Sequence, residues 1–273
     1  ARPVAPGRQM AYAPAPIAEV VATIRAKRPG VVFAPHVETA AGMLLPDAYL
    51  RAVADAVHEV GGLFVLDCID MQATGVDMLI SAPQKGWSSS PCCGLVMLSE
   101  RARTAMDTTT SSSFTLDLRK WQQIMEAYES GSHAYHSTMP TDALTKMRDA
   151  MLETQALGFE HLCSQQQELG RKVRAMFAAK GFRSVAAEGF QAPGVVVSYT
   201  DDAGLHSSKS FLAQGLQTAA GVPLQCDEPA DFKTFRIGLF GLDKLQHVER
   251  TLANLEQALT RIVGVEPAVR AAA

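Results

Sequence analysis

The chain has 273 residues, of which 47% are hydrophobic and 19% are charged, so its composition is that of a globular protein and not of a disordered one. Its 25 basic and 28 acidic residues give a net charge of −3, which argues against partners such as nucleic acids and anionic membrane surfaces. No apolar run approaches the length that a membrane span needs.

The first residues are not typical of a natural start. They read ARPVAPG, with no initiator Met and no signal-peptide pattern. A helix is predicted soon afterwards, because Ile17, Val20, Val21 and Ile24 share one face before Pro29-Gly30. We therefore expect the natural polypeptide to begin earlier.

Four short apolar runs predict strands that are buried on both faces: Val31–Phe33, Leu63–Leu66, Met78–Ile80 and Leu95–Leu98. Between the first two runs, the spacing of apolar residues over Leu50–Val57 predicts a helix. Such strands, alternating with amphipathic helices, are typical of a mostly parallel sheet sandwiched by crossover helices. The sequence therefore predicts an α/β fold.

The second half of the chain begins with a long helical stretch, predicted over residues 141–180. Strands at Val195–Val197 and Phe235–Phe240 follow, with a helix near Ser208–Ala220 between them. A final helix is predicted from apolar residues spaced by three and four, with a capping box made by Asp243 and Gln246. We expect the long helix to bridge a larger domain, residues 1–155, and a smaller C-terminal α/β domain, residues 156–273.

The five cysteines indicate a reducing compartment, because their number is odd and their spacing fits no disulfide framework. A cytoplasmic protein is therefore expected. Cys92 and Cys93 are adjacent, but no CxxC or Cys/His cluster accompanies them. We expect no metal site there and interpret these cysteines as small buried apolar side chains.

Two polar residues follow buried strands. Asp67 closes one apolar run, and Lys85 comes shortly after another. Either could be an ordinary loop residue, but the carboxyl ends of parallel strands form the edge where open α/β sheets bind ligands. A lysine and an aspartate that face one cavity suit pyridoxal phosphate (PLP), because the amine can form a Schiff base and the carboxylate keeps the pyridine nitrogen protonated.

Five stretches then resemble those of the class V (fold type I) PLP-dependent aminotransferases, in particular the alanine/serine–glyoxylate or –pyruvate group. They occur in the family order over nearly the whole chain: His36–Gly42, Leu66–Asp67, Ser81–Gly86, Tyr135–Pro140 and Phe235–Gly238. The resemblance implies a large cofactor-binding domain with a smaller C-terminal α/β domain. It also implies ping-pong transamination between a small amino acid and a keto acid.

The resemblance assigns the reacting groups to three residues. Lys85 would hold the cofactor as a Schiff base and act as general base and acid at the substrate Cα. Asp67 would pair with the pyridinium nitrogen, and Arg236 would bind the substrate α-carboxylate through its guanidinium. Because Arg236 lies within an apolar strand, an unpaired cation there would be costly, which also favours a ligand or an acidic partner.

Four further residues match cofactor contacts of the family. Thr39 would hydrogen-bond near the ring hydroxyl, and Gln84 would contact the cofactor. Tyr135 and Thr138 would reach the phosphate from the partner subunit of a homodimer. Taken alone, Thr39 is equally a turn hydroxyl, and Thr138 equally a helix cap.

Two departures from the family pattern lie beside the expected site. Only 35 residues precede His36, and neither the glycine-rich phosphate loop nor the aromatic residue that stacks on the ring is visible. Asp67 and Lys85 are also only 18 residues apart, closer than in the family. We expect the natural protein to contain further segments around the cofactor. An intact mass larger than that of these 273 residues would confirm this.

Other functions remain open on this scaffold. A lyase of the same fold, such as a desulfurase, would need a mobile nucleophilic cysteine, and Cys92 and Cys93 follow the lysine closely. Decarboxylases and aldolases share the fold as well. A cofactor-free paralogue that acts as a binding module would explain the absent phosphate loop.

Overall fold

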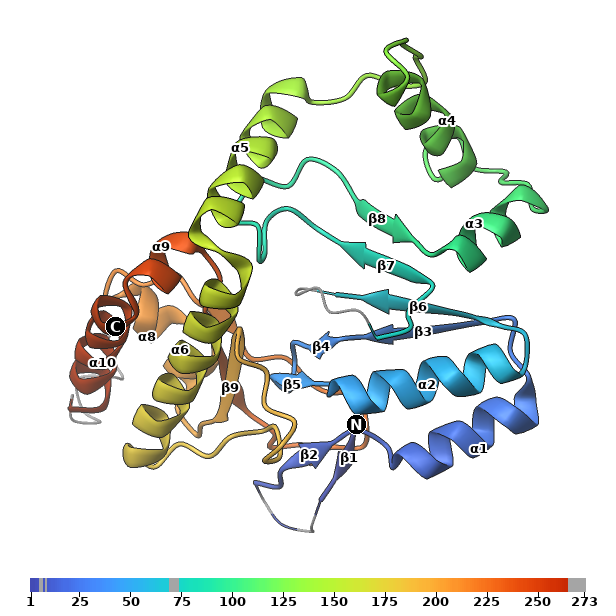
Figure 1. Ribbon diagram of the computed structural model, residues 1–273. Coiled ribbons are helices and arrows are strands. Elements are labelled where there is room, and N and C mark those ends of the chain that lie inside the picture. The colour runs from blue at the N-terminus through green and yellow to red at the C-terminus, as the bar shows by residue number, and fades with distance from the viewer. Residues whose placement is uncertain (5–6, 8, 69–73, 265–273) are drawn as a thin grey trace.

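The small sheet of this protein lies between helix α6 (Phe159–Ala179) and the β4–β5 hairpin (residues 37–44) beside the main sheet (Figure 1). The computed structural model describes residues 1–4, 7, 9–68 and 74–264. Its first part contains β1 (Arg2–Pro3), β2 (Tyr12–Ala13), α1 (Ile17–Lys27), β3 (Val31–Pro35), β4 (Val37–Glu38), β5 (Met43–Leu44), α2 (Asp47–Glu59), β6 (Leu63–Asp67), β7 (Met78–Ser81), β8 (Leu95–Leu98), α3 (Glu100–Asp107) and α4 (Leu118–Glu129). Its second part contains α5 (Thr141–Leu157), α6 (Phe159–Ala179), β9 (Val195–Tyr199), α7 (Ala203–His206), α8 (Lys209–Leu212), β10 (Ala219–Ala220), β11 (Thr234–Gly238), α9 (Leu242–Gln246) and α10 (Val248–Gly264).

The main sheet confirms the predicted mostly parallel architecture. Its strand order is β3-β6-β7-β8; the first three strands are parallel, and β8 is antiparallel to β7. The central strand β6 is buried, and its Phe64 and Leu66 pack with Leu50 and Val57 of α2 on the face that α1 and α2 cover (Figure 1).

Burial on both faces was a wrong expectation for the two outer strands. On β3, Phe33 is 72% exposed and Val31 is also exposed, and on β8 Val96 and Met97 are exposed. Phe33 points to the face opposite to that of α1 and α2, because Val32 and Ala34 pack against that helical layer. Among the described residues, nothing covers Phe33.

The helical stretch predicted over residues 141–180 is two helices and not one. α5 ends at Leu157 and α6 begins at Phe159, with Gly158 between them at φ +89°. A residue in this left-handed region interrupts the helical hydrogen bonding, and glycine reaches it without strain. The predicted domain boundary after residue 155 falls in the last turn of α5, and it stays a prediction.

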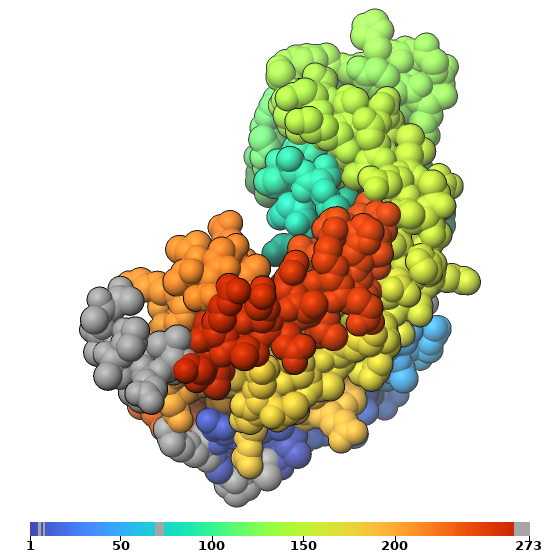
Figure 2. Space-filling model, turned by 90° about the vertical axis from the view of Figure 1, so that its left-hand side faces the viewer, coloured from blue at the N-terminus to red at the C-terminus, as the bar shows by residue number. Residues whose placement is uncertain are grey.

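The small sheet has the order β10-β11-β9 and is antiparallel. Helices α6 and α10 bury one of its faces; they lie side by side, and Figure 2 shows α10 on the surface next to α6. Leu169, Phe235 and Leu259 are fully buried between them. The helix expected over residues 208–220 is instead the short helix α8 followed by β10, and the equally short α7 precedes them.

The predicted capping box of the final helix is wrong. Asp243 lies inside the short helix α9, and its carboxylate pairs with Arg250 of α10. His247, at φ −133°, separates α9 from α10. A side-chain cap that was not predicted occurs at α7, where Asp202 accepts a hydrogen bond of 2.7 Å from the backbone N–H of Leu205.

A third apolar cluster joins the two parts of the molecule. It combines Tyr12 of β2 and Met43 of β5 with Val197 and Tyr199 of β9. The Tyr199 hydroxyl donates a hydrogen bond of 2.7 Å to the carbonyl oxygen of Met10. The segment before α1 therefore packs against the small sheet.

Glu228 closes the loop between β10 and β11. Its carboxylate accepts hydrogen bonds from the backbone N–H groups of Leu224, Gln225 and Cys226. Partial burial raises the pKa of this carboxyl, but the backbone donors outweigh burial and lower the pKa to about 2.

We expect Glu228 to make the protein less stable in acid. A carboxyl whose pKa is lowered on folding stabilises the folded state above its unfolded pKa, and this contribution is lost as the pH falls toward the folded value. The free energy of unfolding of the wild type should therefore fall between about pH 4.5 and pH 2 relative to that of Glu228→Gln. Urea unfolding across this range measures the difference, and parallel pH profiles for the two proteins would contradict the prediction.

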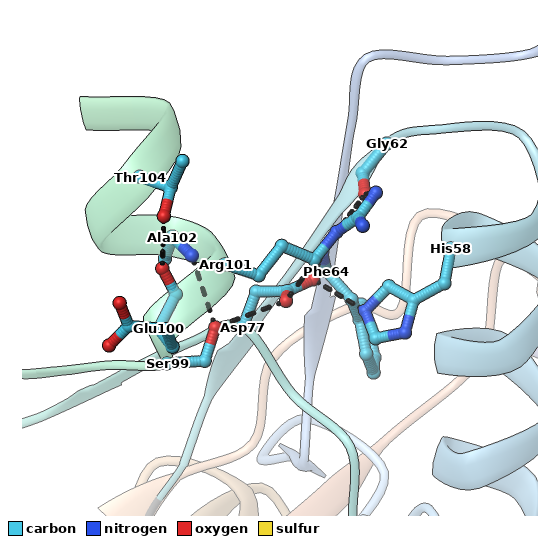
Figure 3. Close-up of polar contacts among 9 residues, drawn as sticks. All are labelled: His58, Gly62, Phe64, Asp77, Ser99, Glu100, Arg101, Ala102 and Thr104. Atoms are coloured by element: carbon cyan, nitrogen blue, oxygen red, sulfur yellow. Dashed lines mark hydrogen bonds and ion pairs between the residues drawn. The ribbon is translucent and has the colours of Figure 1, made fainter. Parts of the chain in front are cut away.

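A buried polar cluster lies at the edge of the main sheet where β6 and β7 begin (Figure 3). Asp77, 2% exposed, accepts hydrogen bonds from the backbone N–H of Phe64 (2.8 Å) and from the Ser99 hydroxyl (3.2 Å). Its Oδ2 lies 2.7 Å from His58 Nε2, and its Oδ1 lies 3.9 Å from Arg101 Nε. The cluster ties α2, the strands and α3 together.

Within the described ranges, none of the helices combines the length and apolar character that crossing a bilayer requires.

Candidate functional site

The carboxyl ends of β3, β6 and β7 lie at one edge of the main sheet, because these strands are parallel. Two backbone hydrogen bonds align the ends: His36 N–H donates to the Asp67 carbonyl (2.7 Å), and Cys68 N–H donates to the Ile80 carbonyl (2.8 Å). Asp67 is the last residue of β6, and its side chain is exposed. Lys85 follows the end of β7 by four residues, so both predicted residues are at this edge.

The loop that carries Lys85 is folded against the small domain. Ser88 N–H donates to the Lys85 carbonyl (3.0 Å), and the Ser88 hydroxyl accepts a hydrogen bond of 2.8 Å from Leu242 N–H at the start of α9. The half-buried Lys85 ammonium lies 5.8 Å from the ring centroid of Phe240, within the range of a cation–π contact. The described residues give Lys85 no ion pair with Asp67.

Thr39 lies in the turn between β4 and β5, which also contacts the small sheet. The Glu38 carboxylate accepts a hydrogen bond of 2.7 Å from Ala40 N–H within this turn. Gly42, at φ +66°, approaches β9 so closely that a Cβ there would lie 2.9 Å from the Val195 carbonyl oxygen. The turn is therefore held against β9 at one point.

We expect Gly42→Ala to destabilise the protein by about 2–4 kcal/mol, because it adds a steric clash to the cost of a positive φ. Gly131→Ala is the matched control, since Gly131 has a φ of +77° but open space around its Cα, so it reports the backbone cost alone. Urea unfolding compares the two. Equal losses would show that close approach to β9 contributes nothing.

Arg236 lies in the centre of β11, directly opposite Val197 of β9. Opposite residues of an antiparallel pair share a face. Arg236 is therefore on the face where Val197 contacts the turn at Gly42. Its Nε donates a hydrogen bond of 2.6 Å to the Ala220 carbonyl, and the described residues provide no carboxylate partner. The guanidinium thus keeps donors for an acid group from outside the chain.

Tyr135 and Thr138 are not brought to this edge within one chain. They lie in the loop between α4 and α5, where the two hydroxyl oxygens are 3.0 Å apart. Tyr135 is 76% exposed and Thr138 is also exposed. Gln84 is at the edge, but its side chain is exposed as well.

The structure adds Phe240 and Ser88, which sequence reasoning missed. Phe240 lies beneath the Lys85 amine, and Ser88 fastens the lysine loop to α9. The one signal in the sequence for a role of Phe240 is its position, two residues after β11, the strand that carries Arg236. The serine run after Lys85 gives no sign that one hydroxyl caps a helix 154 residues away.

A cavity of about 710 Å³ opens behind the lysine loop. Its wall is mostly apolar and includes Trp87, Phe159, Leu162, Phe240 and Leu242. None of the predicted site residues lines it. The cavity nevertheless adjoins the lysine loop, because Phe240, which contacts the Lys85 amine, also lines it.

No family model matches the chain. Among curated proteins, it is 23% identical to an alanine–glyoxylate aminotransferase of Felis catus over 86% of this chain and 58% of that protein. It is also 23% identical to a protein named soluble hydrogenase, small subunit, of a Synechococcus strain, over 87% of this chain and 62% of that one. A 2-aminoethylphosphonate–pyruvate transaminase of Paraburkholderia phymatum is 25% identical over 83% of this chain and 61% of that protein.

Among solved structures, the alanine–glyoxylate aminotransferase of Nostoc sp. superposes with a TM-score of 0.74 at 20% identity, over 89% of this chain and 65% of that one. The chain is therefore similar in sequence and in fold to these aminotransferases. Its fold is that of the fold type I PLP-dependent transferases, as the sequence motifs predicted. The chain spans about three fifths of the length of the curated class V relatives it matches.

The described residues fit the reactive end of the class V cofactor. A lysine amine, a carboxylate at a strand end and a threonine hydroxyl come from three neighbouring loops of one sheet edge. These are the groups that the aldehyde, the ring nitrogen and the ring hydroxyl of PLP require. The phosphate contacts expected from Tyr135 and Thr138 are not formed at this edge by the same chain.

Proposed function

We propose that this protein is a PLP-dependent aminotransferase that exchanges an amino group between a small amino acid, alanine or serine, and a keto acid, glyoxylate or pyruvate. The observation that carries the proposal is that Lys85 and Asp67 both lie at the carboxyl edge of the main sheet. Arg236, on the face of the small sheet that the Gly42 turn contacts, supports it. The names of two curated relatives, which include glyoxylate and pyruvate, support the choice of acceptor.

The proposal gives each of these residues a defined role. When bound, PLP supplies an electron sink for the charge that develops at the substrate Cα. The Lys85 amine holds the cofactor and then moves a proton at that carbon. The Asp67 carboxylate keeps the proton on the ring nitrogen, because an opposite charge favours the protonated form. Thr39 and Gln84 orient the ring.

Arg236 selects the substrate by its acid group. A guanidinium binds a carboxylate through two parallel hydrogen bonds, which fixes the Cα relative to the lysine. The two half-reactions, from amino acid to keto acid and back, use the same residues in a ping-pong sequence. The contact of the lysine loop with α9 sets the spacing between Lys85 and Arg236, because α9 follows β11 directly.

A homodimer in the cytoplasm is part of the proposal. The region of α4 and its flanking loops exposes a group of large apolar side chains, of which Leu116 is 75% exposed. Exposed apolar patches of this kind mark association sites. The others are Phe114, Met125, Tyr128 and Tyr135. Tyr135 and Thr138 lie at this patch and reach the partner's phosphate site. The five free cysteines support a reducing location.

Titration with PLP tests the proposal. We expect a visible absorbance band at one equivalent, followed by amino transfer from alanine or serine to glyoxylate or pyruvate, detected by mass spectrometry of the products. No spectral change would favour the cofactor-free binding module. A band without amino transfer, but with release of sulfide from cysteine, would favour the desulfurase-like lyase.

Arg236→Lys is expected to raise the KM for the amino acid by about tenfold or more, because a lysine cannot form the bidentate contact. The kcat should fall less than kcat/KM if the arginine acts mainly in binding. The rates are measured with alanine at fixed glyoxylate. An unchanged KM would remove Arg236 from the proposed site.

A further inference from the structure

Three sulfur atoms lie together where the loop after β7 meets α5. Cys92 Sγ is 3.8 Å from Cys93 Sγ, and Cys93 Sγ is 3.9 Å from Met147 Sδ. Met147 is buried on α5, whereas both cysteines are half-buried, free thiols. The two cysteines are therefore only partly buried, and not the buried apolar side chains that were expected. The result is a cluster of soft donors that solvent can reach from one side.

Two of the three separations among these atoms, Cys92–Cys93 and Cys93–Met147, match those of sulfur ligands around one metal ion. A first-row metal binds sulfur at about 2.3 Å, which separates its ligands by about 3.8 Å in a tetrahedral site and about 4.0 Å in a trigonal one. Both distances in the cluster are in this range. A thioether adds no proton, so the only groups that an ion has to displace are the two thiol protons.

The donor chemistry selects the ion. Two thiolates and a thioether are soft ligands that suit Cu(I), whereas structural zinc takes four ligands from Cys and His, and calcium takes oxygen. No group of three or more His, Cys, Asp or Glu side chains in the described residues is arranged to hold a metal. We propose that Cys92, Cys93 and Met147 form a binding site for one Cu(I) ion. On binding, each thiol releases its proton to solvent, and the copper stays Cu(I).

Binding would also have a structural consequence. The loop that carries the cysteines is the same loop that carries Lys85, and Met147 belongs to α5. An ion shared by the three sulfurs joins this loop to α5. The site itself does not depend on the proposed aminotransferase activity, because none of its three ligands belongs to that machinery.

Anaerobic titration with Cu(I), in competition with the chelator bicinchoninate, tests the proposal. The wild-type chain should withdraw one equivalent of Cu(I) from the chelator. X-ray absorption of that complex should show three sulfur neighbours at about 2.3 Å. Cys93→Ser should no longer withdraw Cu(I) from the chelator, and neither should Cys92→Ser. Testing both variants keeps the experiment valid if one of them fails to fold. Met147→Leu has a similar volume and should retain copper with only two sulfur neighbours.

Cys163→Ser is the matched control, because Cys163 is also a half-buried free cysteine but lies on α6 away from the cluster. It should bind copper as the wild type does. The proposal is overturned if the wild type leaves the copper on the chelator, or if folded Cys92→Ser and Cys93→Ser proteins both bind as the wild type does. It is also overturned if Met147→Leu keeps three sulfur neighbours.

Discussion

Lys85→Ala should abolish amino transfer and remove the visible absorbance band that PLP gives with the wild-type chain. Lys85 is the lysine at the carboxyl edge of the parallel strands, and its loop is fastened to α9 by Ser88. Loss of an essential nucleophile and base of this kind lowers kcat by about 10⁴-fold or more. Rates are measured with the donor and acceptor that the wild type uses.

The control for this variant is Lys27→Ala. Lys27 is exposed at the end of α1, just before β3 begins, whereas the lysine loop follows the end of β7. Both the absorbance and the rate should therefore stay at the wild-type level. Turnover that persists in Lys85→Ala would reject the assignment of this lysine. A Lys85→Ala protein that has lost its circular dichroism spectrum would have to be replaced by Lys85→Arg, for which the same loss of turnover is expected.

Asp77→Ala should give the largest loss of stability, about 3–5 kcal/mol, because it removes a buried carboxylate and leaves the groups that hydrogen-bond to it, among them the buried Phe64 amide, without their acceptor. The Phe64 amide, the Ser99 hydroxyl and the His58 ring all direct polar atoms at this one side chain (Figure 3). The free energy of unfolding in urea measures the loss.

Asp55→Ala provides the comparison, since Asp55 is an exposed aspartate on the same helix as His58 and should change stability by no more than about 0.5 kcal/mol. A loss below about 1 kcal/mol for Asp77→Ala would mean that solvent or a neighbouring group replaces the carboxylate. PLP binding by the folded Asp77→Ala protein should be unchanged, because Asp77 lies at the opposite edge of the sheet from Lys85.

Much of the fold could be predicted because its core elements carry strong patterns. The apolar residues of α2 and α10 recur at helical spacing, and the central strand β6 is a continuous apolar run. The break at Gly158 escaped detection because apolar residues continue on both sides of it. Helices α3 and α4 were not predicted, since most of their residues are polar or exposed.

The candidate site was predicted to the extent that it lies in local motifs. Lys85 and Asp67 could be placed at the same edge because each closely follows a strand. Contacts between distant segments could not be predicted. Phe240 lies beneath Lys85 but is 155 residues away from it in the sequence. Met147 lies beside Cys93 but is 54 residues away. The burial of Asp77 could not be predicted from the sequence either, because it results from the packing of α2 and α3 at the start of β6 and β7.

The single glycine between α5 and α6 has a consequence for which molecules the protein can accept. Gly158 sets the angle at which the two helices meet, and α6 packs directly on β9, the neighbour of the strand that holds Arg236. In the proposed function, this bend and the contact of Ser88 with α9 together set the distance between Arg236 and the Lys85 amine. A change at Gly158 would therefore alter the length of substrate that fits between them, with every chemical group left in place.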